Sequence, residues 1–261
     1  MALMAHCGEL LPMPDGAIFS DVKNEPEEVY RWLDWLEGVL SFPVYRVTAG
    51  DLKDKALKVH VNSKTKKEYY DTRIPVFVKS GNSNGRGQSG RHCTRDFKLR
   101  PLLKKQRELA HIKVGCKEEK VVSWVGISSD EIWRMKESMA LWCKNRFPLV
   151  EKRMNRQDCK RWMETHGYPE PPRSACIFCP YHSDSEWRRM KDQHPSEFLK
   201  AVDFEKRLQV VQKSVTTPGK DVGIPFLHRS LKNLDEVDFS TDLENGQLSL
   251  WNNECEGMCG V

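Results

Sequence analysis

The sequence predicts an α/β fold with an open, mostly parallel sheet flanked by helices and a helical, loop-rich C-terminal part. Short apolar segments alternate with segments of helical period over residues 16–167, which is typical of a parallel sheet covered by helices. Beyond residue 154 the apolar positions recur at helical spacing around one irregular segment rich in Pro and Cys. We therefore expect an α/β domain over residues 1–153. A cysteine-containing helical region with an acidic tail should follow over residues 154–261.

The first half of the chain supplies one helix and several strands in alternation. Residues 1–9 indicate a short helix, and the apolar run at 16–21 predicts a buried strand. Residues 24–40 predict a helix, because Pro26 stands near its start and apolar side chains recur every three or four positions. Further strands are expected at residues 43–50, 57–61 and 73–80, before a Gly/Ser-rich loop at residues 80–90.

The second half begins with a helix at residues 99–112, a buried strand at 121–128 and a helix at 129–144. Asn155 and Asp158 resemble a capping box, so a helix should begin there and end at Gly167. After an irregular segment, two more helices are expected at residues 184–191 and 195–213.

Composition excludes several classes of protein. The chain has 261 residues, with 42 Lys and Arg against 37 Asp and Glu, and its mean hydropathy is −0.64. No apolar run approaches the roughly 20 residues that a membrane helix needs, and the N-terminus lacks a secretory signal pattern. Nine cysteines, an odd number in a chain of this size, indicate a reducing cytoplasm and thiols with a chemical or metal-binding role.

The net charge of +5 combines a basic middle with an acidic end. Residues 86–113 hold nine Lys and Arg against two acids, whereas residues 233–261 hold seven acids and no Lys or Arg. The basic stretch suits phosphate, on a nucleotide or on nucleic acid, or an acidic protein partner. A solvated helix face over residues 100–109 is the competing interpretation.

The sharpest motif is the pair Cys176 and Cys179, because two thiolates three positions apart in a tight turn can bind one metal or one cluster. A redox-active pair would show the same spacing. Cys159 and Cys93 could join this pair around an iron–sulfur cluster. A zinc site is the main rival, with the four ligands Cys176, Cys179, Cys255 and Cys259. We expect the remaining cysteines to be core thiols: Cys7, Cys116 and Cys143.

Two further segments could contact an anion. Arg91, Arg95, Lys98 and Arg100 surround Cys93, and such cations can hold a phosphate or sulfate group. Ordinary surface charge ahead of a helix is the alternative. At the end of the strand predicted at residues 121–128, Gly126 would allow close approach of a ligand, and Arg134 could reach back to its phosphate.

These segments together resemble the phosphoadenosine phosphosulfate (PAPS) reductase family of the adenine-nucleotide α-hydrolase and ATP pyrophosphatase superfamily, in its phage or prophage type. The similarity covers roughly residues 17–179. GAIFSDVKNEP at 16–26 lies where the family has a strand and an Asp-Thr-Gly turn, and CTRDFKLRPL at 93–102 resembles a Cys-Cys-x-x-(Arg)-Lys-x-x-Pro-Leu segment. Residues 126–134 resemble the family's Gly…Arg segment. A family helix and the loop after it resemble residues 148–172, PLVEKRMNRQDCKRWMETHGYPEPP. The family's second cysteine pair corresponds to SACIFC at residues 174–179.

The resemblance implies that residues 1–153 form a nucleotide-binding-like domain that is truncated at its N-terminus. It also implies a [4Fe-4S] cluster and an adenine nucleotide. The implied cluster ligands are Cys93, Cys159, Cys176 and Cys179, with Cys159 in place of the adjacent cysteine that the reductases carry. The implied nucleotide-binding residues are Asp21, Arg95, Lys98, Gly126 and Arg134. The tail ECEGMCGV is similar to a mobile catalytic tail, which implies that Cys255 or Cys259 is a nucleophile.

The sequence departs from the family at its front. Residues 1–9 match the helix that follows the family's phosphate-binding loop, so the preceding strand and loop are expected to be absent. Val22 and Lys23 also replace the Thr-Gly of the next turn. Three functions follow: an enzyme of sulfur or nucleotide chemistry in the cytoplasm of a bacterial host, a non-catalytic phage-encoded binding or inhibitor protein with a structural metal, or a nucleic-acid sulfur-modification enzyme.

Overall fold

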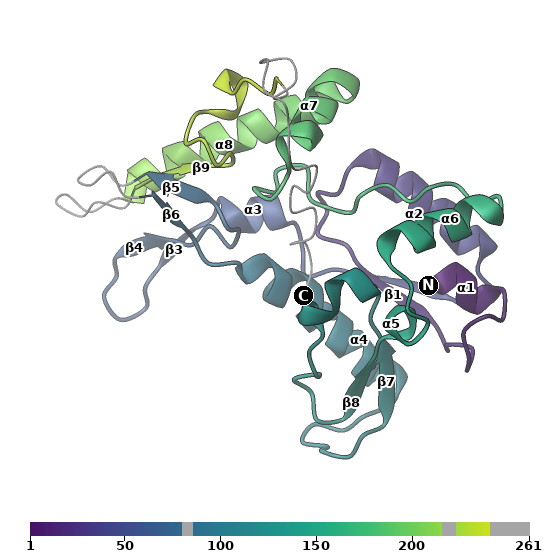
Figure 1. The fold of residues 1–261 in the computed structure, drawn as a ribbon. Coiled ribbons are helices and arrows are strands. Elements are labelled where there is room, and N and C mark those ends of the chain that lie inside the picture. Colours follow the sequence, from purple (N-terminus) through teal and green to yellow (C-terminus); the bar gives the residue numbers. More distant parts are fainter. Residues whose placement is uncertain (80–85, 216–222, 241–261) are drawn as a thin grey trace. The chain divides into compact units, whose positions relative to one another are not determined.

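A computed structural model describes residues 1–79, 86–215 and 223–240, and the chain in it divides into two compact units (Figure 1). Unit 1 comprises Met1–Ser20, Glu27–Val47 and Leu99–Arg173, and unit 2 comprises Asp21–Pro26, Thr48–Lys98 and Ser174–Val261. Each unit is therefore assembled from three separate segments. The boundary expected near residue 153 differs from this division, because the chain leaves unit 1 directly after its first strand and returns to it twice.

Unit 1 contains two parallel pairs of strands. Strand β1 (Ala17–Ser20) pairs with β2 (Val44–Val47) through the crossover helix α2 (Glu27–Val39), with Ala17 opposite Val44. Strand β7 (Val121–Trp124) pairs with β8 (Cys143–Arg146). Among the residues that the structure describes, the two pairs are not hydrogen-bonded to each other. The strands of unit 1 thus form two small parallel sheets in place of the single larger sheet that the sequence predicted.

Helices surround these pairs and bury their apolar sides. They are α1 (Ala2–His6), α4 (Arg100–Leu109), α5 (Pro148–Glu151) and α6 (Arg156–Thr165). Helix α4 contacts β1 and β2, and Met4 of α1 packs with Phe42 and Leu149 in one apolar cluster. Asn155 and Asp158 form the predicted capping box at the start of α6.

The helix predicted at residues 129–144 does not form. Only a short 3₁₀ segment, η2 (Ser129–Arg134), is helical, and the chain then runs to β8. The apolar side chains that suggested the helix lie largely in solvent: Trp133 is 75% exposed and Met139 is 85% exposed. An amphipathic helix is stabilised mainly by packing its apolar face against a core, and these side chains have no such core to cover. Cys143, at the end of the stretch, is instead buried in the β7–β8 pair.

Unit 2 consists of antiparallel sheets and two long helices. Its first elements are α3 (Leu52–Ala56), β3 (Val59–Val61), β4 (Glu68–Tyr70), β5 (Phe77–Lys79), β6 (Arg86–Gln88) and the π-helical segment η1 (Thr94–Leu99), which runs into α4. Its last are α7 (Asp184–Gln193), α8 (Pro195–Val215), β9 (Ile224–Phe226) and η3 (Leu234–Glu236). Strands β3 and β4 form a hairpin, and β6, β5 and β9 form an antiparallel sheet in that order.

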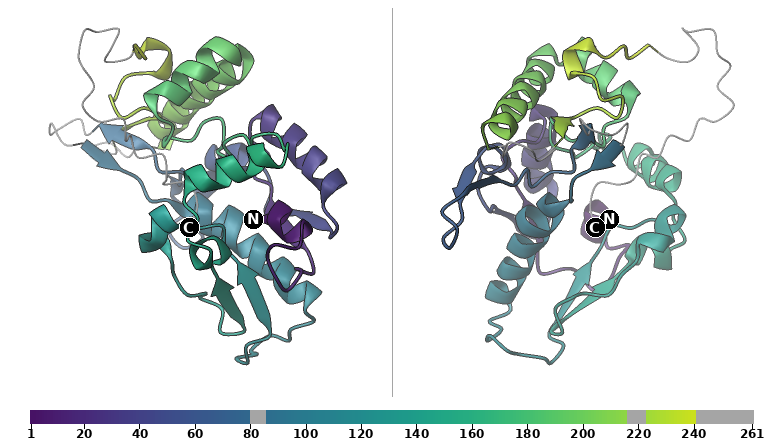
Figure 2. Two further views of the ribbon diagram at one scale, coloured as in Figure 1. Left: turned by 45° about the vertical axis from the view of Figure 1, so that its right-hand side comes forward. Right: turned by 90° about the vertical axis from the view of Figure 1, so that its left-hand side faces the viewer.

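The core of unit 2 lies between α7, α8 and the sheet segments, and Figure 2 shows the two helices side by side in green. Trp187 and Phe204 have no exposed surface, and Phe178 stacks on Phe204 with ring centroids 4.1 Å apart. The predicted helical C-terminal part is confirmed by α7 and α8. In the described parts of the chain, none of the helices has the length and apolar character needed to cross a membrane.

Candidate metal and anion site

The predicted cysteine pair occupies a tight turn in unit 2. The backbone N–H of Cys179 donates to the carbonyl of Cys176 at 2.8 Å, and the N–H of His182 donates to the carbonyl of Cys179 at 3.1 Å. The Nε2 of His182 lies 2.9 Å from the carbonyl oxygen of Cys176, so this nitrogen carries the proton and donates. The ring of His182 packs edge-on against Trp187. The turn is therefore fixed by its own backbone and by one buried imidazole.

Cys93 lies in the same unit, at the start of the helical segment that continues as η1. Its backbone N–H donates to the carbonyl of Arg73 at 2.7 Å, which fixes the entry of the chain. Burial raises the pKa of the Cys93 thiol, while the positive charges of Arg91 and Lys98 act in the opposite direction. A π-helical segment such as η1 is uncommon and is found frequently at functional sites.

All three of these cysteines pack against one apolar core. Cys176 is a buried member of the core of unit 2, and Cys93 and Cys179 are partly buried against it. The three thiols are free of disulfides. Arg91 also lies over the ring of Tyr181, 5.4 Å from its centroid, so the segment around Cys93 touches the segment around the pair. The structure thus gathers three of the four predicted cluster ligands in one unit.

A loop that follows β1 connects these two segments. The carbonyl of Asn24 accepts the backbone N–H of Ile177 at 2.9 Å, which joins the loop to the cysteine turn. The Ser174 hydroxyl donates to Oε2 of Glu25 at 3.1 Å, and Nζ of Lys98 lies 3.6 Å from Oε1 of the same carboxylate. The Glu25 side chain is only 1% exposed. A buried carboxylate therefore links the segment that leads into the cysteine turn to Lys98, one of the cations near Cys93.

Two of the predicted anion-binding cations of unit 2, Arg95 and Lys98, are engaged with carboxylates. Nε of Arg95 lies 2.9 Å from Asp96, and Nη1 of Arg73 lies 3.2 Å from the same carboxylate. The hydrogen bond from Arg95 to Asp96 raises the pKa of the guanidinium further. Lys98 approaches Glu25 as described, with about a quarter of its side chain exposed. An anion arriving here would compete with fixed carboxylates for these cations.

Asp21, predicted to contact a nucleotide, is almost fully buried. Its carboxylate accepts the backbone N–H of Lys23 at 2.7 Å and lies 2.8 Å from the Lys23 ammonium group. Lys23 has a positive φ of 65°, in the region that favours glycine. The position that resembles the family's turn thus holds a local ion pair.

Three of the site residues that the family resemblance implies lie in unit 1. Arg134 is in η2, where its Nη1 lies 2.7 Å from Glu131. Gly126 follows β7, and a Cβ placed there would meet only the end of the Met1 side chain at 3.9 Å. Cys159 is on α6 and packs partly buried against the cluster that contains Leu149. Burial raises the pKa of its thiol, against the effect of the nearby N-terminal ammonium group. The role of Cys159 as a fourth ligand stays a prediction.

The other cysteines differ in how deeply they are buried. Cys143 is buried as expected and Cys116 is half-buried, but Cys7 is exposed, with its sulfur 3.5 Å from the hydroxyl of Tyr168. The expectation of a core thiol was therefore wrong for Cys7. Cys255 and Cys259 lie outside the described residues.

The basic stretch 86–113 is divided between the two units. In unit 1, Lys105 lies 2.7 Å from Glu108 and also over the ring of Tyr45, and Arg107 lies over Trp142. These cations on α4 have partners within their own unit.

Sequence reasoning missed Asn24, Glu25 and Ser174, which connect the site segments. The signal for Asn24 and Glu25 is a run of polar residues shortly after a buried strand, a position where polar side chains are buried only when they have partners. Ser174, between α6 and α7, has no such signal. Among the described residues, no group of three or more His, Cys, Asp or Glu side chains is arranged to hold a metal ion. Comparisons with protein-family models, curated proteins and solved structures found no match to this chain.

Proposed function

We propose that this chain is a PAPS reductase-like iron–sulfur protein that binds an adenine nucleotide or sulfonucleotide and acts in sulfur or nucleotide chemistry. The proposal includes a [4Fe-4S] cluster on Cys93, Cys176, Cys179 and a fourth cysteine. We propose further that the parallel strand pairs of unit 1 derive from an adenine-nucleotide α-hydrolase-like fold. The protein would be encoded by a phage and act in the cytoplasm of a bacterial host.

The observation that carries the proposal is the position of three cysteine thiols, from two distant segments of the chain, against one apolar core. Cysteine sulfur is the donor that iron–sulfur clusters use. Cys176 and Cys179 lie three positions apart in one tight turn, a spacing that suits two ligands of the same cluster. Partial burial of Cys93 and Cys179 suits a cluster shielded from water. When bound, such a cluster would exchange single electrons and polarise a neighbouring sulfonate or adenylate group.

The chain's own residues would position the anionic substrate. Lys98 and Arg91 act electrostatically at Cys93, and both can donate charge-assisted hydrogen bonds to a sulfonate or phosphate. Glu25 holds Lys98 in the buried network and the hydroxyl of Ser174 holds Glu25. This network supports a role for Lys98 as the cation beside Cys93, the first of the proposed ligands.

An anaerobic preparation tests the metal. We expect a brown protein with iron and sulfide, and we expect Cys93→Ser, Cys176→Ser and Cys179→Ser each to lose most of the iron. Cys143→Ser is the matched control, because Cys143 lies in a separate apolar cluster of unit 1. A colourless, iron-free wild-type protein would refute the cluster, and zinc in its place would favour the rival site with Cys255 and Cys259.

The fourth ligand has its own experiment. Cys159→Ala should lose iron if Cys159 completes the cluster. Full iron content in this variant would exclude Cys159, and Cys255→Ala and Cys259→Ala would then locate the ligand in the tail.

A second candidate function is a non-catalytic binding protein with a structural metal. It is favoured by the ion pairs that engage the predicted nucleotide-binding cations, Arg95 with Asp96 and Arg134 with Glu131. Calorimetry with ATP, adenylylsulfate and PAPS separates the two functions. Binding of any of them supports the first, whereas an iron-containing protein that binds none supports the second.

A further inference from the structure

The β3–β4 hairpin and the helix α3 before it form a concentrated basic element of unit 2. Residues 52–70 contain six lysines against two acidic residues. The lysines are Lys53, Lys55, Lys58, Lys64, Lys66 and Lys67. We call residues 52–70 the basic hairpin. This element is separate from the basic stretch at 86–113 and from the cysteine site.

The positive charge of the basic hairpin is not compensated within the part of the chain that the structure describes. None of its six ammonium groups lies within ion-pair distance of a carboxylate there, whereas Lys23, Lys98 and Lys206 each have an acidic partner. Uncompensated charge on one projecting element attracts a polyanion over a long range.

The tip of the hairpin has a fixed backbone. The N–H of Lys66 donates to the carbonyl of Asn62 at 2.9 Å, and the N–H of Asn62 donates to the carbonyl of Lys67 at 2.9 Å. The side-chain Oδ1 of Asn62 accepts the N–H groups of Lys64 and Thr65, both at 2.9 Å. A tip preformed in this way presents its lysines at little further cost in backbone ordering.

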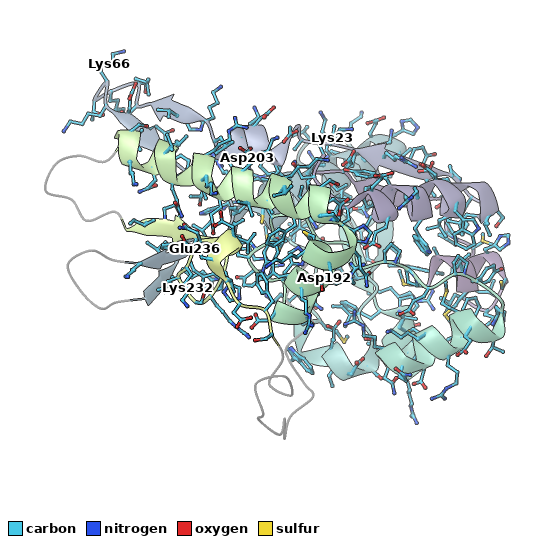
Figure 3. The ribbon with its side chains drawn as sticks, turned by 90° about the horizontal axis from the view of Figure 1, so that it is seen from above. Lys23, Lys66, Asp192, Asp203, Lys232 and Glu236 are labelled. Atoms are coloured by element: carbon cyan, nitrogen blue, oxygen red, sulfur yellow. The ribbon has the colours of Figure 1, made fainter. Side chains whose placement is uncertain are left out.

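The hairpin projects from a fixed base. Tyr70 packs against the core of unit 2, and β4 contacts α8. Beyond this base, every residue from 61 to 69 is exposed. Figure 1 shows the hairpin extending from the body of the unit, and Figure 3 shows Lys66 at its outer end.

Lysines on exposed strands commonly prevent edge-to-edge aggregation, but their placement here differs. The strands cover only Val59–Val61 and Glu68–Tyr70, and all six lysines lie outside these ranges, at the base and the tip. Lysines that protect an edge lie on the strand itself. Protection of the exposed strand edges against aggregation therefore does not explain the positive charge of the hairpin.

The shape of the element selects among polyanions. A two-stranded β-ribbon fits the major groove of B-DNA, about 12 Å wide, whereas the deep and narrow major groove of A-form RNA excludes it. Asn62, Ser63 and Thr65 alternate with the tip lysines and can donate to phosphates. His60 and Tyr69 stack on the ribbon with ring centroids 5.3 Å apart and stiffen it. We propose that the basic hairpin binds duplex DNA, with its tip lysines on phosphates flanking the major groove.

The test is fluorescence anisotropy of a labelled DNA duplex with the full chain, repeated over about 50–200 mM salt. The variant carries Lys64→Gln, Lys66→Gln and Lys67→Gln. A plot of log affinity against log salt concentration has a negative slope. Each lysine–phosphate interaction that the variant cannot make should reduce the magnitude of this slope by about 1, so the plot should become shallower by about 3. Affinity at the lowest salt should fall about tenfold or more.

A control variant with the same charge change carries Lys200→Gln, Lys213→Gln and Lys232→Gln, at exposed positions of the same unit. It should keep the wild-type slope, and circular dichroism should show both variants folded.

Equal losses of affinity in the two variants, or no binding of duplex DNA by the wild-type chain, would overturn the proposal. Equal affinity for an RNA duplex would overturn the placement in the groove. Binding to anionic lipid vesicles but not to DNA would assign the element to a membrane surface. The iron content is independent of every one of these outcomes.

Discussion

Glu205 is a charged residue with no exposed surface, on the face of α8 that points into unit 2. Its two carboxylate oxygens accept backbone N–H groups, from Leu227 at 2.7 Å and from Leu234 at 2.6 Å. Burial raises the pKa of this carboxyl group, although the two amide donors act in the opposite direction. One side chain thus connects α8 to the end of β9 and to η3.

Substitution of Glu205 should change both stability and its pH dependence. Glu205→Ala leaves two buried N–H groups without an acceptor, at a cost of about 1–3 kcal/mol each in the free energy of unfolding. Because the folded pKa is raised, the folded state keeps its proton at pH values where the unfolded state has lost it. Stability should therefore fall as pH rises from about 4.3 through the folded pKa.

Urea unfolding at a series of pH values measures this effect. Glu205→Gln cannot ionise, so the decline should be smaller in this variant, while exposed Glu137→Gln should follow the wild-type curve. An unchanged pH dependence in Glu205→Gln would show that the carboxyl group does not titrate across the transition.

Helix α7 shows what local sequence decides at the scale of an element. It begins immediately after the cysteine turn, at a capping box in which the Ser183 hydroxyl accepts the N–H of Glu186 and the Glu186 carboxylate accepts the N–H of Ser183 at 2.8 Å. Its bounds agree with the predicted helix to within two residues. The stretch 129–144 had a comparable apolar period but no core to cover, and it did not form a helix.

Removal of the α7 cap should destabilise unit 2 modestly. Ser183→Ala leaves an N-terminal amide of α7 without its side-chain acceptor, and we expect a loss of about 1 kcal/mol in the free energy of unfolding. Ser196→Ala, an exposed serine in α8, should change it by less than about 0.5 kcal/mol. Denaturant unfolding of both variants measures the difference, and equal stabilities would contradict the role of the cap.

At the scale of the whole molecule, the two units are interleaved in the chain. Unit 1 combines two segments from the first 47 residues with residues 99–173, and unit 2 combines two segments from the first 98 residues with the chain after residue 173. In unit 2, β5 near residue 78 pairs with β9 near residue 225, and Val76 and Phe97 pack in the same core as Leu208 and Leu227. Neither unit is therefore contained in a continuous piece of the chain.

A piece cut at the boundary suggested by the sequence should not fold. Residues 154–261 alone lack β5, the partner of β9, and the core side chains Val76 and Phe97. We expect no cooperative thermal unfolding and little dispersion of amide signals in a proton NMR spectrum, in contrast to the full chain. A cooperative transition in the isolated piece would show that the C-terminal helices have a sufficient core of their own.

The elements and the site differ in how far the sequence determined them. Helices α2, α6, α7 and α8 and strands β1, β2 and β7 were predictable, because helical period, caps and apolar runs act between neighbours in the chain. The tight turn at Cys176 and Cys179 was predictable for the same reason. The Glu25–Lys98–Ser174 network was not, because its members lie far apart in the sequence and their pairing depends on the fold.

Local structure was predictable from the order of the residues: the α/β alternation, the C-terminal helices, the cysteine turn and the two regions of opposite charge. Which of these parts lie together depends on the fold of the whole chain. It placed Cys93 with Cys176 and Cys179 against the core of unit 2, and Cys159 in a cluster of unit 1. The physical reason is that hydrogen bonds within a helix or turn are fixed by neighbouring residues. The partners in a core and across a sheet are chosen instead by burial of apolar surface over the whole chain.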